Sequence, residues 1–191
     1  MKKFSTLSDL HNYFHTTNIC ALKSESNPVF GDGNEKSNII FIGEAPGKKE
    51  NETGKPFMGS AGKFLTTMLE IIKMDRKDIY ITNIVKYRPP KNRDPKPEEK
   101  ESCKEWLESE IQFIKPKLII FLGRHSLNHF FPDLVISKAH GKLIHQKLGN
   151  FSCEYFLPLY HPAAALYNGG LRTELIKDFK KIPNIIKKIS Q

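Results

Sequence analysis

Two carboxylates and one aromatic residue share a long loop that is rich in glycine. The loop covers residues 43–62 and carries Glu44, Glu50 and Phe57 among five glycines. It follows the apolar run 39–42, so these side chains stand at the end of a predicted buried strand, where α/β enzymes build their sites. Glycine also lets a backbone approach a ligand closely. The alternative is a surface loop with incidental acids, but loops of this length in compact domains are usually functional.

The last residues of this loop are small and begin a predicted helix. They are Gly59, Ser60, Ala61 and Gly62. The first N–H groups of a helix have no partner within it, and together with the helix dipole they attract an anion. The sequence therefore predicts an anion-binding helix start close to the two carboxylates.

Further polar residues follow the next three predicted strands. Asn83 stands at the end of the second strand, the triplet 123–125 (Gly-Arg-His) follows the third, and His161 follows the fourth. Because the carboxyl ends of parallel strands meet at one edge of a sheet, we expect these residues to converge on the glycine-rich loop.

The elements that must position these residues alternate along the chain. Apolar runs and their spacing predict strands at 37–42, 79–85, 118–122 and 153–159, and helices at 6–16, 61–73, 98–114, 124–130 and 171–188, the last interrupted near Pro183. The predicted fold class is α/β: a three-layer α/β/α sandwich with a central four-stranded, mostly parallel sheet. The sequence shows no linker or repeat, so we expect a single domain over residues 1–191.

Composition limits the partners and the compartment. The 30 basic and 21 acidic side chains give a formal charge of +9, which favours a polyanionic partner, although basic charge alone is weak support. The sequence has no signal peptide and no run of about 18 apolar residues, and its three cysteines are widely spaced. We therefore expect a cytoplasmic protein with reduced thiols and no membrane contact. The lack of a GxxxxGKS/T loop argues against a P-loop nucleotide hydrolase.

Four motifs, in this order along the chain, resemble those of the uracil-DNA glycosylase superfamily. They are GEAPG (43–47), GKPFMGSAG (54–62), ITNIVKYRPPKNR (81–93) and YHPAAAL (160–166). The resemblance is to the family 4 type in particular, the iron–sulfur uracil-DNA glycosylases of bacteria and archaea, and it runs from about residue 18 to 182. Several motifs in register are far more specific than a lone glycine-rich loop.

The resemblance implies an enzyme that flips uracil out of DNA and hydrolyses its N-glycosidic bond, which leaves an abasic site for base excision repair. Phe57 would be the ring on which uracil stacks. Asn83 would read the Watson–Crick edge by donating to O4 and accepting from N3–H, a pairing that cytosine cannot match. His161 would donate to O2, where negative charge develops as the bond breaks. A core phenylalanine, a strand-end asparagine and a satisfied loop histidine are the alternatives.

The resemblance also implies a carboxylate near C1′ of the deoxyribose, which becomes cationic as the base leaves. Glu50 is the first choice for this catalytic role, and Glu44 is the second. Glu44 and Ala45 are expected to shape the pocket wall, where backbone N–H groups face the base. Either acid could instead be a solvated loop residue.

The DNA contacts that the resemblance implies fall on three segments. Backbone N–H groups of residues 59–62 suit a phosphate at a helix start. A proline-rich loop and the segment after the fourth strand would supply the side chains of Arg88, Lys91, Arg93, Ala163, Leu166 and Tyr167. The last two are candidates for a wedge in the minor groove. The expected partner is uracil-containing DNA, single- or double-stranded, bound by a monomer.

The chain departs from this family at the iron–sulfur site. Family 4 members bind a 4Fe–4S cluster through four cysteines, and the corresponding positions here are Cys20, Lys23, Tyr87 and Cys103. Lysine and tyrosine do not usually replace thiolate in such a cluster, and Cys153 lies inside a predicted strand. We therefore expect the cluster to be lost, and neither a metal nor another cofactor to be bound.

Two other interpretations remain open. A catalytically weak or inactive relative that binds DNA or protein is supported by the loss of half of the cluster ligands. It is opposed by the joint retention of Glu50, Phe57, Asn83 and His161. A glycosylase with altered base choice, such as hypoxanthine or thymine opposite guanine, is the other, because Asn83 favours uracil without excluding those bases.

Overall fold

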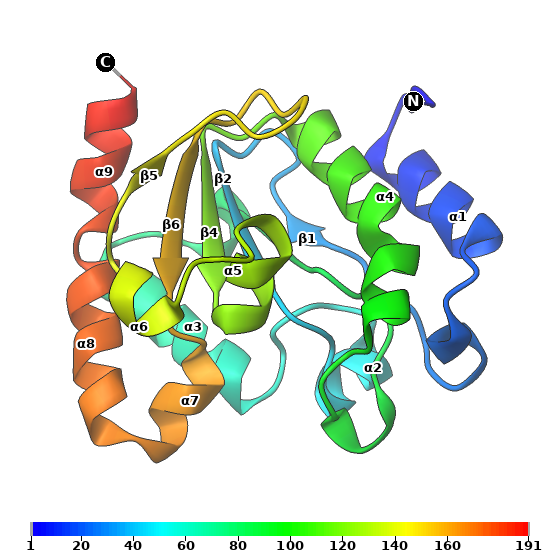
Figure 1. Cartoon of the computed structure of the whole chain (residues 1–191), viewed down its shortest axis with the longest axis horizontal. Coiled ribbons are helices and arrows are strands. Elements are labelled where there is room, and N and C mark those ends of the chain that lie inside the picture. The colour runs from blue at the N-terminus through cyan, green and yellow to red at the C-terminus, as the bar shows by residue number, and fades with distance from the viewer. Residues whose placement is uncertain (1, 191) are drawn as a thin grey trace.

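A computed structural model describes residues 2–190 of the chain, and its centre is a sheet in which four strands run parallel (Figure 1). These strands, in the order β3-β2-β4-β6, are β2 (Ile39–Gly43), β3 (Tyr80–Asn83), β4 (Leu118–Leu122) and β6 (Tyr155–Leu159). Nearly all of their residues are buried because helices cover both faces, which explains the continuous apolar runs in the sequence. The α/β class is therefore confirmed.

The sheet has six strands, so the prediction of four was wrong in number. The two additional strands are β1 (Asp32–Gly33) and β5 (Ile144–His145), which pair antiparallel with β3 and β6 at opposite edges. Each is two residues long, which is too short to produce a recognisable alternation of polar and apolar residues. Their pairing depends on neighbours that the fold supplies.

Helices on both faces complete the predicted three layers (Figure 1). One face carries α1 (Leu7–Thr17), α4 (Pro97–Ile114) and α5 (Arg124–Phe130), and the other carries α3 (Ser60–Ile71), α8 (Gly169–Phe179) and α9 (Ile182–Ile189). The boundary between α8 and α9 is the interruption expected near Pro183. Short segments that the sequence did not predict are α2 (Lys48–Thr53), α6 (Ile136–Ala139), α7 (Pro162–Tyr167) and 3-10 turns at Ala21–Ser24, Arg76–Asp78 and Pro90–Asn92.

Successive residues of each strand enter two separate cores. In β2, Ile40 and Ile42 pack in the core under α1 and α4, whereas Ile39 and Phe41 pack in the core under α3 and α8. Burial of each such side chain stabilises the fold by roughly 1.5–3 kcal/mol. The sheet is thus held from both faces, and the loops at the carboxyl ends of its strands rest on a rigid support.

Among residues 2–190, no helix combines the length and the apolar character that a membrane span requires.

The loops that carry the predicted site residues lie at the carboxyl ends of β2, β3 and β6. The glycine-rich loop with α2, the proline-rich loop before α4, and the start of α7 follow these strands and meet there (Figure 1).

Candidate active site

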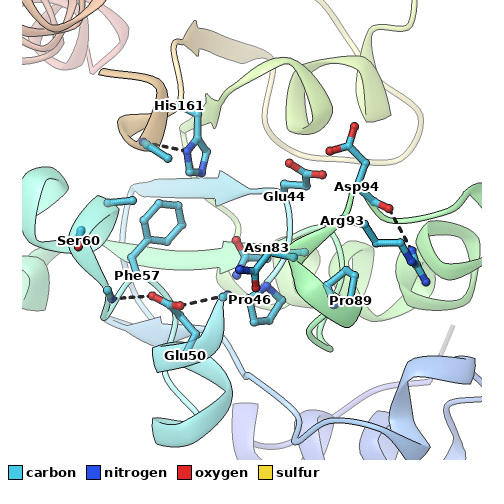
Figure 2. A pocket seen from close by; sticks show the side chains of 16 residues that line it. Glu44, Pro46, Glu50, Phe57, Ser60, Asn83, Pro89, Arg93, Asp94 and His161 are labelled. Atoms are coloured by element: carbon cyan, nitrogen blue, oxygen red, sulfur yellow. Dashed lines mark hydrogen bonds between the residues drawn. The ribbon is translucent and has the colours of Figure 1, made fainter. Parts of the chain in front are cut away.

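A pocket of about 350 Å³ lies where these three loops meet (Figure 2). Two of the loops supply most of its wall, and α7 supplies the rest. The lining residues are Glu44, Ala45, Pro46, Gly47, Glu50, Phe57, Gly59, Ser60, Ala61, Asn83, Pro89, Asn92, Arg93, Asp94, His161 and Ala163. Among the predicted site residues, the other members of the glycine-rich loop, Asn83, Arg93, His161 and Ala163 contribute to this lining, whereas those outside it are Gly62, Arg88, Lys91, Leu166, Tyr167 and the triplet 123–125. The expected convergence at one edge of the sheet is therefore present.

Phe57 is held in a strained backbone conformation at one side of the pocket. Its φ of 55° is unusual for a residue with a side chain, and such strain costs about 1–3 kcal/mol. Arg76 holds the strained segment, because its guanidinium donates to the carbonyl of Phe57 at 3.0 Å and to that of Pro56 at 2.9 Å. A Cβ on Gly62 would lie 1.8 Å from the Phe57 carbonyl oxygen, so this glycine allows α3 to start against the turn.

Asn83 ends β3 opposite Gly43, the last residue of β2. A Cβ on Gly43 would lie 2.4 Å from Asn83 Oδ1 and 2.7 Å from the Phe57 ring, so the glycine leaves room for both side chains. Asn83 is 3% exposed, and within residues 2–190 its side-chain amide makes no hydrogen bond. Among residues 2–190 no buried side-chain nitrogen or oxygen atom lacks a hydrogen-bond partner, so the polar atoms of this amide are open to the pocket and available to a ligand.

His161 precedes α7 and caps it. Its Nδ1 accepts a hydrogen bond from the backbone N–H of Ala163 at 3.1 Å, so in the neutral ring the proton is on Nε2. Burial, with a smaller contribution from the nearby His125, lowers the pKa of His161 to about 4. The ring lies 5.7 Å from that of Phe57. His161 is therefore a neutral hydrogen-bond donor that faces the pocket beside the stacking surface (Figure 2).

Glu50 connects the two halves of the glycine-rich loop. Its Oε1 accepts from the N–H groups of Met58 and Gly59, both at 2.7 Å, and its Oε2 accepts from the N–H of Gly47 at 3.1 Å. The carboxylate thus occupies the N-terminus of α2 and part of that of α3, where negative charge is favoured. The N–H of Gly59 is consequently not free for a phosphate, in contrast to the sequence-based expectation.

Glu44 lies on the opposite side of the pocket in an acidic environment. Burial raises its pKa to about 7, and the neighbouring Asp94 contributes to the increase. Ligand atoms of Glu44, Asp94 and His125 lie within 4.8 Å of one another, close enough to surround a cation. However, the guanidinium of Arg124 lies 3.3 Å from Asp94 and 3.1 Å from His125 Nε2, and its positive charge already balances this group.

The basic residues predicted to contact DNA are partly engaged within the protein. Arg93 forms two hydrogen bonds with Glu99, at 2.6 and 2.9 Å, and so fastens the proline-rich loop to the start of α4. Arg88 donates to Asn92 at 2.7 Å. At the end of α7, Leu166 is 39% exposed and its neighbour Tyr167 is 92% exposed, so both wedge candidates are accessible.

The four positions of the family's iron–sulfur site do not form a suitable ligand set. Cys20 and Cys103 are buried, and a hydrogen bond between their sulfur atoms lowers the pKa of Cys20. Tyr87 is fully buried, its hydroxyl lies 3.3 Å from His15 Nδ1, and burial raises its pKa, which keeps it a phenol. Lys23 donates to the carbonyl of Thr16 at 3.1 Å. Two thiols, a phenol and an ammonium group do not fit a 4Fe–4S cluster.

Several residues of the site were not identified from the sequence. Arg76 lies in a 3-10 turn remote from every motif, and nothing in the local sequence indicates that it reaches the Phe57 loop. Asn92 lies within the motif 81–93 and Asp94 directly follows it, and their polar side chains on the proline-rich loop are a usable signal. Their position relative to Glu44 depends on how two loops pack.

Beside the pocket geometry, comparison with known proteins gives a second line of support for the family that the sequence motifs resemble. The sequence model of the Uracil DNA glycosylase superfamily matches residues 30–182. The chain is 46% identical over 166 residues to the type-4 uracil-DNA glycosylase of Saccharolobus solfataricus. The aligned residues make up 84% of this chain and 76% of that protein. It is 44% identical over 183 residues to the type-4 enzyme of Archaeoglobus fulgidus, with 93% and 92% covered.

A third relative is the type-4 uracil-DNA glycosylase of Thermotoga maritima, which is 40% identical over 170 residues, 86% of each chain. The family match spans every segment that lines the pocket, from the glycine-rich loop to the start of α7. On the strength of this shared sequence and of the pocket that it builds, the chain belongs to the uracil-DNA glycosylase superfamily.

Proposed function

We propose that this protein is a uracil-DNA glycosylase, which receives a flipped uracil and hydrolyses its N-glycosidic bond, leaving an abasic site in base excision repair. The observation that carries the proposal is the meeting of three groups in one pocket. These are an aromatic ring (Phe57), an unpaired amide (Asn83) and a neutral imidazole donor (His161). Together they match the flat face, the Watson–Crick edge and the O2 atom of uracil.

Base choice is assigned to Asn83. Its amide has one donor and one acceptor side, and it lies beside the Phe57 ring on which the base stacks. Uracil pairs with both sides through O4 and N3–H. Cytosine presents an amino group and an unprotonated N3 instead, so binding it leaves the amide unpaired. Such mismatches of buried polar groups discriminate strongly between ligands.

Bond cleavage is assigned chiefly to His161. As the bond breaks, negative charge accumulates on the leaving base, and a donor placed at O2 stabilises this charge more than the neutral ground state. The lowered pKa of His161 keeps the ring neutral at physiological pH, and the bond from Ala163 orients Nε2–H outward. The donor is therefore in place before the charge develops.

Glu50 is proposed to stabilise the cationic sugar and to orient the attacking water. Three backbone N–H groups hold its carboxylate at the pocket wall, so little motion is needed when the charge appears. Glu44 is less suited to the role, because with a pKa of about 7 it carries only part of a negative charge at neutral pH. With Ala45, it is proposed to form the wall against the base.

DNA is proposed to lie across the pocket mouth. The remaining free N–H groups at the start of α3, at Ser60 and Ala61, suit a phosphate. Ala163 and the exposed Leu166 and Tyr167 are proposed to enter the minor groove. We further propose that the protein acts as a monomer in the cytoplasm, on single- or double-stranded DNA.

We also propose that the iron–sulfur cluster of the type-4 enzymes is lost in this chain. The unsuitable donor set supports this, as does the way in which the region is already filled. Tyr87 packs beside Trp106 in the larger core, and the side-chain amide of Asn18 donates a hydrogen bond to the main-chain carbonyl of Ser102. Ordinary packing and hydrogen bonding thus connect α4 to the N-terminal segment.

The decisive test is release of uracil by the purified protein. Oligonucleotides that contain one uracil, one hypoxanthine, one thymine opposite guanine or none of these are incubated with the protein in the presence of EDTA, and abasic sites are then cleaved with alkali. We expect cleavage at uracil only, in both strand contexts. No cleavage above the buffer control by a protein shown to be folded would indicate an inactive relative, and cleavage at hypoxanthine or thymine instead would indicate a different base choice.

A further inference from the structure

A fully buried ion pair contacts the main chain of Asn83, one of the residues that line the pocket. The side chains of Lys86 and Glu110 are both 0% exposed, and Lys86 Nζ lies 2.5 Å from Glu110 Oε2. Removing two charges from water is costly, and apolar residues of similar size are often at least as stabilising as a buried pair. Stability alone therefore gives no reason for this arrangement, which leads us to consider what the pair contacts.

Lys86 makes three hydrogen bonds, which use all three of its ammonium protons. Besides Glu110, it donates to Thr82 Oγ1 at 2.6 Å and to the main-chain carbonyl of Asn83 at 2.9 Å. The bond to the Asn83 carbonyl reaches the residue whose side chain is assigned to base reading. Asn83 is the last residue of β3, where the pairing with β2 ends at Gly43.

Glu110 is in turn held by two further side chains. Thr82 Oγ1 donates to it at 2.9 Å and the Tyr80 hydroxyl donates at 3.2 Å, both from β3, while Glu110 itself belongs to α4. The Tyr80 hydroxyl lies 3.3 Å from His11 Nε2 in α1, and Trp106 donates to His11 Nδ1 at 3.1 Å. The network therefore ties the end of β3 to two helices of the large core.

We propose that Lys86, held by Glu110, is a positioning residue that sets the orientation of the Asn83 amide. This inference rests on the proposed function of the pocket. The bond from Lys86 to the Asn83 carbonyl restrains the peptide that follows Asn83. The bond from Lys86 to Thr82 Oγ1 restrains the residue before it. An amide whose backbone is restrained on both sides already presents its donor and acceptor in the orientation that the base requires. A displacement of about 1 Å in such a group can cost roughly a hundredfold in rate.

The first test is a double-mutant cycle in the uracil release assay. In Lys86→Met we expect single-turnover excision at saturating DNA to slow about tenfold to a hundredfold, with DNA affinity changed much less. In an Asn83→Ala background the same change is expected to have no further effect, because there is no amide left to orient. Lys86→Arg, which retains the charge and the donors, is expected to recover part of the rate.

A matched control removes the general effects of losing a buried charge. Asp178, in α8, is another buried carboxylate; it is bonded to His140 at 2.6 Å and to Lys181 at 2.7 Å, and none of these three residues lines the pocket. Glu110→Gln and Asp178→Asn both replace a buried carboxylate by an amide. We expect Glu110→Gln to slow excision and Asp178→Asn to leave it unchanged. If Lys86→Met alone does not fold, Lys86→Met/Glu110→Gln, which removes both charges, replaces it.

A measurement that does not depend on activity separates this inference from the proposed function. The side-chain amide signals of Asn83 in ¹⁵N-labelled protein are expected to shift or broaden in Lys86→Met and to remain in place in Asp178→Asn. Unchanged signals in both variants would overturn the positioning role, as would rate losses that multiply in the Asn83→Ala background. Absence of uracil release by the wild type would instead count against the proposed function, with the amide signals still deciding the inference.

Discussion

The pocket combines three side chains whose chemistry is set by their immediate surroundings. His161 is neutral because burial opposes a second proton, and Phe57 faces the pocket from a strained turn. Asn83 is available because no group in the described part of the chain pairs with its side-chain amide. A ligand that stacks on the ring, pairs with the amide and accepts from the imidazole uses all three groups, which is the pattern of a site built for one base.

Removal of the two reading groups is expected to affect rate more than binding. In Asn83→Ala and His161→Ala, single-turnover excision of uracil should slow about a hundredfold, which corresponds to roughly 3 kcal/mol for one transition-state hydrogen bond. Affinity for uracil-free DNA should change little, because phosphate contacts dominate it. Wild-type rates in both variants would show that the assigned roles are wrong.

Glu44 gives a prediction about stability and pH. Its pKa is about 7 in the folded protein, above the ordinary value of 4.5, so the folded state keeps a proton that the unfolded chain has released between these values. Stability is therefore lost as the pH rises through this window. Glu44→Gln, which stays neutral, should match the wild type near pH 4 and exceed it at pH 8, by up to about 3 kcal/mol.

Urea unfolding at pH 4, 6 and 8 measures this difference. Glu25→Gln, at an exposed position, is the control for the loss of one negative charge. A gap between Glu44→Gln and the wild type that stays constant over this pH range would mean that Glu44 titrates normally.

At the scale of elements, the site depends on how loops are fastened to the sheet. Glu50 joins the start of α2 to that of α3, Arg93 joins the proline-rich loop to α4, and Arg76 joins the turn before β3 to the Phe57 segment. None of these fastenings is regular secondary structure. Each is a charged side chain bonded to backbone groups or to another charge, which gives a loop the rigidity that catalysis requires.

Arg76 provides the test of this view. Arg76→Met removes both bonds to the carbonyls of Pro56 and Phe57, so the segment is free to relax its positive φ and move the stacking ring. We expect excision to slow at least tenfold with a modest loss of stability. Lys77→Met, one residue away and exposed, is the control. Equal rates in the two variants would show that the ring is held by packing alone.

At the scale of the molecule, two cores of buried side chains hold the sheet between its helices. The larger core includes Cys20, Tyr87 and Cys103 next to Trp106, and each of these side chains is buried. The region that four cysteines organise in the resembled family is therefore part of a continuous apolar core here. Its contribution to stability should be that of ordinary side chains.

The protein is accordingly expected to purify without colour. It should lack absorbance near 400 nm, and its unfolding transition should be the same before and after chelator treatment, because loss of the cluster, as proposed, leaves no metal-binding energy coupled to folding. Cys20→Ala and Cys103→Ala should each cost on the order of 1 kcal/mol in urea unfolding. A brown protein with about four irons per chain would contradict this and would require ligands other than the four aligned positions.

The sequence by itself determined the parallel strands of the sheet, the longer helices and the identity of the central pocket residues. Continuous apolar runs such as 39–42 are long enough to specify buried strands, and residues placed after such strands must meet at one edge. For this reason Phe57, Asn83 and His161 were found in advance, together with the edge that brings them into one pocket.

Only the tertiary structure decided the parts that depend on contacts between distant segments. β1 and β5 are two residues each and exist because a neighbouring strand offers them partners. Arg76 reaches Phe57 across 19 positions of sequence, and Lys86 meets Glu110 across 24. Such contacts leave no local period or motif, since a side chain's partner is set by how elements pack and not by its neighbours in the chain.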